Sequence, residues 1–310
     1  MGTKAAGAAQ IRIGVSGWRY APWRGVFYPK GLAQARELAF AARQFPVLEL
    51  NGSFYSLQRP HSWAAWAQAT PPGFVFTVKA PRFITHMLRL RDCRAAIANF
   101  FASGLFALGP KLGPILWQLP PTLPFDAGTL EEFLGLLPHD TTRAAALARE
   151  REPRMRGRER LEPPAPACRI RHALEVRHAS FATPECIALL RRHGVALVVA
   201  DTAGRWPELG DVTADFVYLR LHGARQLYAS GYSEAQIDAW ADRIRAWHRG
   251  GAPRGMALAG PAAQAPAAPQ GGRDVFCFFD NTEKLHAPEN ALHLARALRL
   301  DPATLRPAVR

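Results

Sequence analysis

Short runs of β-branched and aromatic residues alternate with longer stretches of helical periodicity along the whole chain. Eight runs predict strands: IRIGVS (11–16), VLELN (47–51), FVFTVK (74–79), PILWQ (114–118), RHALEVR (171–177), VALVVAD (195–201), DFVYLRLH (215–222) and DVFCFFD (274–280). Helical patterns lie between them, for example at 33–44, 62–69, 91–107, 129–137, 184–193, 234–249 and 288–299. Such alternation is typical of a parallel sheet, and eight repeats in about 250 residues favour a closed barrel. We therefore expect an α/β protein with a single (β/α)8 barrel of the TIM type. An open, doubly wound sheet is the alternative, but its glycine-rich phosphate turn is missing after the first strand.

Two segments interrupt the alternation. Residues 149–169 are charged and then proline-rich, and residues 250–272 consist of glycine, alanine and proline with almost no charge. The second segment predicts a flexible surface insertion before the last strand. Neither segment separates two halves that would each fold alone. We therefore expect one barrel domain over 11–300, with a flexible N-terminus at 1–10 and a C-terminal tail at 301–310.

Basic residues outnumber acidic ones. Lysine and arginine total 39 against 25 aspartates and glutamates, and the resulting formal charge of +14 would suit a nucleic-acid partner. Most of these residues are arginines, which a GC-rich coding sequence also favours. Within 149–171 the arginines are interleaved with glutamates, as on a solvated surface. Nucleic acid is therefore a weakly supported partner.

The sequence does not predict a membrane protein. No stretch approaches the ~20 apolar residues that a membrane span needs. The first ten residues lack the basic start and apolar core of a secretion signal, so we expect a cytoplasmic protein. The sequence carries no indication of the oligomeric state.

The seventh strand carries polar residues where a buried strand should be apolar. Alternate residues of this strand form an apolar face suited to the helix layer, and the others are Tyr218, Arg220 and His222. An arginine and a histidine on a buried parallel strand have no solvent-facing side to occupy. We therefore expect both to line a polar mouth at the end of the barrel.

The remaining strands end in the same way. Their polar terminal residues are Ser16, Glu49 and Asn51, Thr77 and Lys79, Gln118, Glu175 and Arg177, Asp201, and Asp280. In a barrel the carboxyl ends of all strands meet at one face, where active sites lie. Ionic groups inside a barrel are costly unless they are paired or functional. Single pairs would be ordinary ion pairs, but eight strands ending this way predict a ligand site.

The residue types at this mouth suit an anionic ligand. Lys79, Arg177 and Arg220 would hold a phosphate or carboxylate, with hydrogen bonds from Gln118 and Asn281. For proton transfer, the candidates are Glu49, Glu175, His222 and His86. Aromatic residues beyond the first two strands, such as Trp18 and Tyr55, would stack on a sugar or base, or simply pack the loops.

A metal site is an alternative use of the same strand ends. Glu175, Asp201 and His222 would form an open set of ligands for a divalent cation. The sequence contains no H-E-x-x-H, G-x-S-x-G or P-loop motif that would decide among anion binding, metal binding and metal-free acid–base chemistry. A divalent metal is the one cofactor considered.

Ordered motifs along nearly the whole chain resemble the domain of unknown function 72 family, the YecE-like proteins. They are SGWRYAPWRGVFYP (16–29), ELNGSFY (49–55), FTVKAPRFITH (76–86), LWQLPP (116–121), LEVRHASF (174–181), YLRLHG (218–223), GYS (231–233) and FFDNTEKLHAPENA (278–291). The resemblance implies a TIM-type barrel and no established activity. The matching positions are Trp18, Tyr20, Glu49, Asn51, Tyr55, Lys79, His86, Gln118, Glu175, Arg177, His178, Arg220, His222 and Asn281. At 280 and 282 this chain has Asp and Thr where many relatives have Asn and Asp, which would change the ligand bound there.

These observations favour an enzyme that acts on a small anionic or phosphorylated substrate at the barrel mouth, as a hydrolase, isomerase or lyase. Glutamate and histidine would move the proton. The alternatives are a metal-assisted hydrolase or isomerase, a nucleic-acid-binding protein that uses a basic surface, and a sensor that binds its ligand without catalysis.

Overall fold

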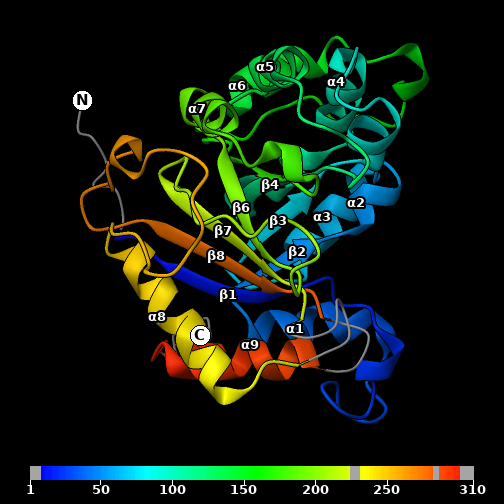
Figure 1. Ribbon diagram of the computed structural model, residues 1–310. Coiled ribbons are helices and arrows are strands. Elements are labelled where there is room, and N and C mark those ends of the chain that lie inside the picture. Colours follow the sequence, from blue (N-terminus) through cyan, green and yellow to red (C-terminus); the bar gives the residue numbers. More distant parts are fainter. Residues whose placement is uncertain (1–7, 224–230, 282–285, 301–310) are drawn as a thin grey trace.

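In the computed structural model, which describes residues 8–223, 231–281 and 286–300, eight parallel strands close into a barrel (Figure 1). Neighbouring strands follow the order of the sequence, and the last strand pairs with the first. The strands are β1 (Ile11–Ser16), β2 (Val47–Leu50), β3 (Val75–Lys79), β4 (Leu112–Gln118), β5 (His172–Glu175), β6 (Ala196–Asp201), β7 (Phe216–Leu221) and β8 (Asp274–Phe279). The predicted (β/α)8 fold is confirmed, and each strand lies within three residues of its predicted bounds.

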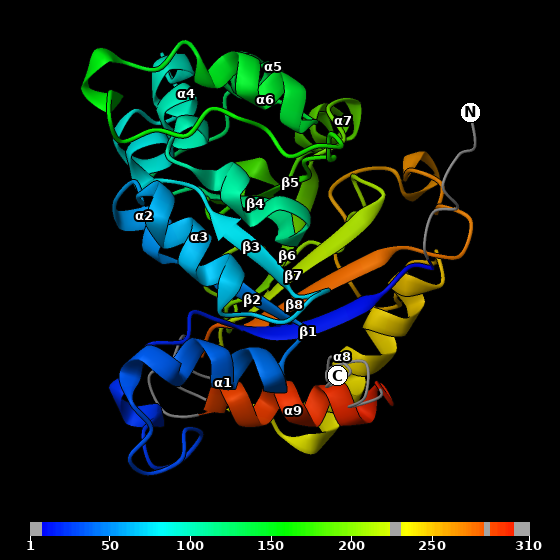
Figure 2. The ribbon, with the colours of Figure 1, turned by 180° about the vertical axis from the view of Figure 1, so that it is seen from behind.

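Helices surround the barrel (Figures 1 and 2). They are α1 (Glu37–Gln44), α2 (Gly52–Tyr55), α3 (Pro60–Gln68), α4 (Arg94–Ala102), α5 (Ala127–Gly135), α6 (Thr141–Ala148), α7 (Pro184–Arg192), α8 (Glu234–His248) and α9 (His286–Ala297). Helices α1, α8 and α9 cover one side of the barrel, and α4 to α7 lie on the opposite side. None of the helices among the described residues is long and apolar enough to cross a membrane.

Capping residues explain where several helices begin. Ser233 and Gln236 form a reciprocal capping box at the start of α8. The side chains of Thr183, Asp126 and Asp140 accept a backbone N–H at the starts of α7, α5 and α6. Helix α6 was not predicted, although its cap signal is present in the sequence.

Side chains of one parity fill the barrel interior. On β7, Phe216 and Tyr218 belong to the interior cluster and Arg220 follows them, whereas Val217 and Leu219 pack with the helix layer. This is the parity that the sequence predicted. On β1, Gly14 occupies an interior position where a Cβ would collide with the backbone of β2, so the close approach of these strands requires glycine.

The segment 250–272 makes more contacts than a flexible insertion would. The carboxylate of Asp211, which is 4% exposed, accepts hydrogen bonds from the backbone N–H groups of Ala259 and Gly260 at 2.8 and 3.0 Å. Arg191 donates to the carbonyl oxygen of Pro261. The segment is therefore fastened to the barrel at these points.

At the chain ends, Gln10 already pairs with β8, because its N–H donates to Asp274 and its carbonyl accepts from Val275. Residues 1–7 of the expected flexible N-terminus and the expected tail at 301–310 lie outside the described residues.

The role of Asp211 can be tested by substitution. Asp211→Ala should lower the free energy of unfolding by about 2 kcal/mol, because it leaves two backbone donors without their acceptor. Chemical denaturation measures this effect. Asp238→Ala, which changes an exposed aspartate on α8, should have little effect. Equal stabilities of the two variants would show that the 250–272 segment is only loosely attached.

Candidate active site at the mouth of the barrel

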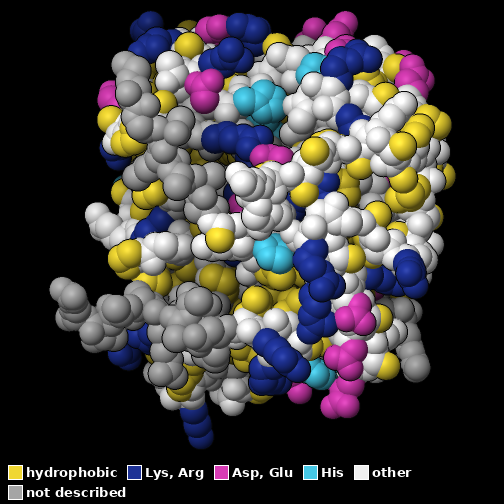
Figure 3. Space-filling view, turned by 90° about the vertical axis from the view of Figure 1, so that its left-hand side faces the viewer, with side chains coloured by type: hydrophobic (Ala, Val, Ile, Leu, Met, Phe, Trp, Pro, Cys, Tyr) yellow, Lys and Arg dark blue, Asp and Glu magenta, His cyan; other side chains and the backbone are white. Residues whose placement is uncertain are grey.

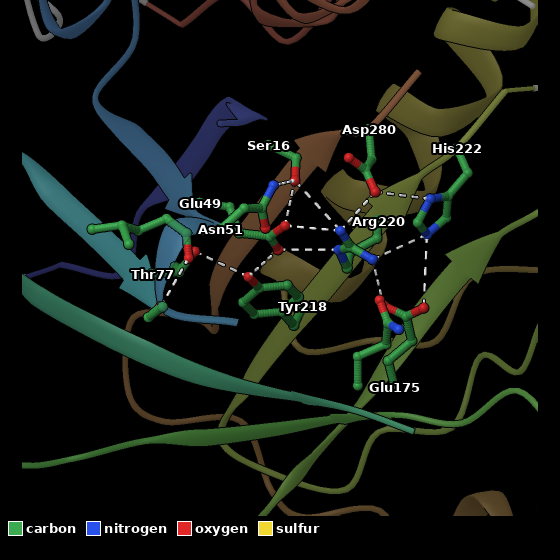
Figure 4. A network of polar contacts seen from close by, with 12 residues as sticks. Ser16, Glu49, Asn51, Thr77, Glu175, Tyr218, Arg220, His222 and Asp280 are labelled. Carbon is green, nitrogen blue, oxygen red and sulfur yellow. Dashed lines mark hydrogen bonds and ion pairs between the residues drawn. The ribbon is translucent and has the colours of Figure 1, made fainter. Parts of the chain in front are cut away.

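Arg220 lies at the centre of a buried charge network (Figure 4). Its side chain is fully buried and contacts three carboxylates. Nε and Nη2 donate to the two oxygens of Glu49 at 3.0 and 2.8 Å, Nη1 donates to Glu175 at 2.6 Å, and Nη2 donates to Asp280 at 2.7 Å. Longer contacts of 3.4 Å join it to His222 and Ser16. Every nitrogen of this guanidinium is therefore engaged inside the protein.

Glu49 is equally enclosed. One carboxylate oxygen accepts from Ser16 Oγ at 2.5 Å, and the other accepts from the Tyr218 hydroxyl at 2.7 Å, in addition to the bonds from Arg220. The side chain has no exposed surface. Glu49 was predicted to be a catalytic base and Arg220 a substrate ligand, but the structure places both beneath the mouth, bound to each other.

Glu175 is held between two arginines. Its oxygens accept from Arg177 Nε at 2.7 Å and from Arg220 Nη1 at 2.6 Å. Burial alone would raise the pKa of Glu175, but the positive charges of Arg177 and Arg220 outweigh burial and hold the pKa well below its usual range. Such a carboxylate is a poor proton acceptor at neutral pH, in contrast to the predicted role.

His222 and Asp280 complete the network. His222 Nδ1 lies 3.1 Å from Asp280 Oδ2. Burial, together with the charge of Arg220, lowers the pKa of His222, so the imidazole is neutral at pH 7. Burial would raise the pKa of Asp280, but Arg220 and His222 lower it further than burial raises it. His222, a predicted candidate for proton transfer, is therefore a neutral hydrogen-bonding partner within the network.

A cavity of about 480 Å³ lies beside this network at the ends of β3, β4 and β5. Among the described residues, its lining contains three cationic side chains and no carboxylate. The lining residues are Phe54, Tyr55, Lys79, Arg82, His86, Gln118 and Arg177. Five of the thirteen site residues that the sequence predicts meet here: Tyr55, Lys79, His86, Gln118 and Arg177.

Arg177 forms one wall of the cavity. Its guanidinium donates to Glu175 and, at 3.0 Å, to Gln118 Oε1, and it stacks on the ring of Trp206 at 3.9 Å. These contacts fix the plane of the guanidinium at the cavity surface.

His86 occupies a π-helical turn over Phe83–Met87 that follows β3. Its Nδ1 lies 2.8 Å from the hydroxyl of Thr85, and its ring meets that of Phe54 edge-on. Burial, with the charges of Lys79, Arg177 and Arg82, lowers the pKa of His86 to about 4. His86 is therefore a neutral imidazole in the cavity wall at pH 7.

Three further residues predicted to bind substrate also lie outside this cavity. Trp18 and Asn51 line a separate cavity of about 290 Å³, where Asn51 Nδ2 donates to Ser16 Oγ. Asn281 is buried and donates to Asn290 Oδ1 at 3.1 Å. Thr282 lies outside the described residues.

The predicted metal ligands do not fit a metal site. Asp201 shares the outward parity of Leu197 and Val199, and its Oδ2 accepts from the Tyr232 hydroxyl at 3.0 Å. The oxygens of Glu175 are bound by two arginines. In the described part of the chain, no group of three or more His, Cys, Asp or Glu side chains is arranged to hold a metal ion. The structure therefore corrects the expected convergence of Glu175, Asp201 and His222.

Sequence reasoning missed Arg82 and Trp206. Arg82 is exposed in the loop after β3, and Trp206 lies beyond β6. Neither follows the strand periodicity that identified the other residues. The only available signal for Arg82 was its spacing of four residues from His86, which is one turn of a helix.

The arginine-rich segment near 149–169 pairs with acidic residues. Arg94 binds Glu150, Arg151 binds Glu159, and Arg154 binds Glu152. On the face drawn in Figure 3, lysine and arginine side chains are interspersed with acidic and apolar ones rather than gathered in one continuous patch. Neither observation favours a nucleic-acid interface over a solvated surface.

The fold and the site together define a (β/α)8-barrel protein with a cationic cavity at the carboxyl ends of its strands. The chain belongs to the family described as "Protein of unknown function DUF72", whose profile matches residues 12–310. The family resemblance seen in the motifs is thereby confirmed.

Relatives and solved structures agree with this assignment. The chain is 31% identical to the UPF0759 protein YecE of Escherichia coli K12 over 129 residues, and 31% identical to the UPF0759 protein YunF of Bacillus subtilis over 116 residues. The match to YecE covers 41% of this chain and 44% of YecE, and the match to YunF covers 36% of this chain and 40% of YunF. Less than half of the length of either relative is therefore matched. A DUF72 family protein from Thermotoga maritima has the same fold, with a TM-score of 0.68 and 24% identity over 94% of this chain and 99% of that one. A second, from Enterococcus faecalis, gives a TM-score of 0.64 at 16% identity, covering 94% and 96%.

Proposed function

We propose that this protein is an enzyme that binds a small anionic substrate, with a phosphate or carboxylate group, in the cavity at the barrel mouth. The observation that carries this proposal is the lining of that cavity. Lys79, Arg82 and Arg177 converge on it, and no carboxylate of the described residues lines it.

The buried network accounts for this excess of positive charge. The carboxylates of Glu49, Glu175 and Asp280 all bind Arg220, which lies beneath the mouth. They are therefore turned away from the cavity. An anion that entered would meet the cations of the lining in a partly desolvated place, where Coulomb attraction is stronger than in water.

His86 is the group best placed to exchange a proton with this substrate. Burial is the largest cause of its lowered pKa, and the charges of Lys79, Arg177 and Arg82 are the others. A bound anion would offset those charges and so raise the pKa of His86 toward neutrality. Binding would thereby prepare the imidazole to accept and return a proton near pH 7.

The cavity's position supports an enzyme by analogy, since barrels carry their active sites at this end. Among the residues predicted for catalysis, only His86 lines the cavity. We therefore assign proton transfer to His86. Glu175 instead binds Arg177 and so supports the guanidinium that binds the anion.

Arg82→Gln tests the proposal. Arg82 is exposed and no ion pair joins it to another described residue, so its replacement should leave the fold intact. We expect phosphorylated or carboxylate metabolites that raise the Tm of the wild type to bind this variant about tenfold or more weakly, because one charged hydrogen-bond donor is lost. Differential scanning fluorimetry over a range of ligand concentrations measures this.

The matched control is Arg43→Gln, which removes an exposed arginine from α1, away from the cavity. It should respond to the ligands as the wild type does. If both variants lost the response equally, or if short RNA alone raised Tm and salt abolished the effect, a charged surface rather than the cavity would be the binding site.

A further inference from the structure

Lys79 is a buried lysine without an anionic partner. Its side chain is 9% exposed at the end of β3, and no ion pair or hydrogen bond joins its Nζ to any other group in the part of the chain that the structure describes. Its Nζ lies over the ring of Phe54, 4.3 Å from the ring centre. The carboxylates of the mouth bind Arg220 instead.

Lys111 shows how this protein treats a structural lysine. Its Nζ donates to the carbonyl oxygens of Ala67 and Thr70, both at 2.6 Å, and to the Thr70 hydroxyl at 3.1 Å. Three acceptors satisfy the three donors of an ammonium group. Lys79 has no such set, so packing and hydrogen bonding do not explain why a lysine occupies its position.

We propose that the amine of Lys79 forms an imine with the carbonyl group of an anionic substrate, whose charged group is held by Arg82 and Arg177. The substrate class is an anionic aldehyde or ketone, such as a 2-oxo acid or a phosphorylated carbonyl compound. This inference rests on the proposed function, because it uses the same cavity and the same anion contacts.

Imine formation requires a neutral amine at physiological pH. Burial, together with the charge of Arg220, lowers the pKa of Lys79 to about 8, although the carboxylates of Glu49, Glu175 and Asp280 oppose the shift. An exposed lysine has a pKa of about 10.4, so the neutral fraction of Lys79 at pH 7 is larger by roughly a hundredfold or more. Lysines depressed in this way are the ones that serve as Schiff-base nucleophiles.

The chemical step balances without an oxidant or reductant. The nitrogen lone pair of Lys79 attacks the carbonyl carbon, a C–N bond forms, and the π electrons of the carbonyl move to its oxygen. His86 takes a proton from the new ammonium nitrogen and delivers it to that oxygen, which gives a neutral carbinolamine. A second proton on the oxygen lets it leave as water, and loss of the remaining N–H proton from the iminium leaves the imine. The amine and carbonyl are thus converted to an imine and one water.

The geometry places the two groups for this exchange. The ring of Phe54 contacts both, with the His86 ring centre 5.2 Å away and Lys79 Nζ 4.3 Å away. Both side chains line the same cavity, and an anion bound by Arg82 and Arg177 would raise the pKa of His86, so that its imidazole can accept the proton that the attack releases.

Reductive trapping tests this inference with three matched probes. The full-length protein is incubated with pyruvate, acetone or lactate, each with and without sodium borohydride, and the lysine-containing peptides are mapped by mass spectrometry. Pyruvate carries a carbonyl and an anion, acetone carries only the carbonyl, and lactate carries only the anion. We expect pyruvate to label Lys79 roughly tenfold or more faster than exposed Lys30. Acetone has no charged group for Arg82 and Arg177 to hold, so its preference for Lys79 should be clearly smaller and set by the lowered pKa of the amine alone. Labelling should reach its plateau above about pH 8 rather than above about pH 10.

Two variants test the assignment of the adduct to Lys79. Lys79→Arg keeps a positive charge in the cavity but cannot form an imine, so it should lose the pyruvate adduct. Lys30→Arg, the matched control on the surface, should keep that adduct. Because the wild-type peptide map alone reports which lysine reacts, the test stands even if the Lys79 variant fails to fold.

Each outcome bears on a different claim. If lactate raises Tm but pyruvate labels Lys79 no faster than Lys30, the imine is ruled out and the proposed anion site stands. If neither lactate nor pyruvate raises Tm and Lys79 is not labelled, both fail for this substrate class. Selective labelling of Lys79 by pyruvate over acetone supports both.

Discussion

Arg220→Met should destabilise the protein more than any other single substitution at the mouth. The methionine approximates the length of the arginine but leaves Glu49, Glu175 and Asp280 without their common partner. Removing one member of a buried ion pair typically costs about 3–5 kcal/mol, because an uncompensated charge stays buried. Here three carboxylates lose a partner together. We therefore expect a loss of at least about 4 kcal/mol in the free energy of unfolding, measured by urea denaturation.

The matched control is Arg192→Met, which breaks an ion pair with Glu131 on the surface. The Arg192 side chain is 64% exposed, and such pairs contribute less than about 1 kcal/mol. Similar losses for the two variants would mean that the Arg220 network contributes no more than a surface pair and does not organise the mouth.

His172 should make the stability fall as the solution becomes acidic. Its Nδ1 accepts from Trp117 Nε1 at 3.1 Å, and its Nε2 lies 2.8 Å from the carbonyl oxygen of Pro138. Both nitrogens of the neutral ring are therefore used, and an added proton on Nδ1 would face the N–H of Trp117. Burial lowers the pKa of His172 to about 3.

The sign of the effect follows from proton uptake. In the unfolded chain His172 takes up a proton near pH 6.5, but in the folded protein only near pH 3. The stability due to the neutral ring is thus fully present above about pH 6.5 and is lost as the pH falls toward 3, by roughly 4–5 kcal/mol in total. Between pH 6 and 4.5, the slope that His172 adds should approach about 1.4 kcal/mol per pH unit.

His172→Gln isolates this contribution because glutamine stays neutral throughout. Free energies of unfolding measured from pH 7 to 4.5 should depend on pH less steeply in this variant. The slope should correspond to the uptake of nearly one proton fewer on unfolding. His61→Gln, at an exposed position on α3, should keep the wild-type slope. If the slope of His172→Gln equalled that of the wild type, the ring would not be held neutral in the fold.

The sequence predicted the barrel well because alternating polar and apolar residues on a buried strand indicate which face of the strand is interior. The alternation of Tyr218 and Arg220 with apolar neighbours predicted which face of β7 is interior, and the structure agrees. In β6 the run VALVVAD is apolar at both parities, so periodicity could not assign a face to Asp201. Ala196, Val198 and Ala200 turned out to be interior, which places Asp201 outside.

The role of each residue at the mouth was harder to predict than which residues lie there. A sequence shows that Glu49, Glu175 and Arg220 arrive at one end of the barrel, but not which of them pair. In the structure Arg220 binds the carboxylates of both Glu49 and Glu175, and this pairing leaves Lys79 facing the cavity. Arg82 joins Lys79 there from a loop, where no periodicity applies.

The central claim, that the cavity lined by Lys79, Arg82 and Arg177 binds anions, is tested most directly by locating an anion crystallographically. Crystals of the full chain soaked in selenate, with data collected at the selenium edge, would show the bound anion by its anomalous scattering. The account predicts a peak within hydrogen-bond distance of Arg82 and Arg177, and its loss in Arg82→Gln crystals grown and soaked in the same way. Selenate peaks confined to other surfaces, with none in this cavity, would contradict it.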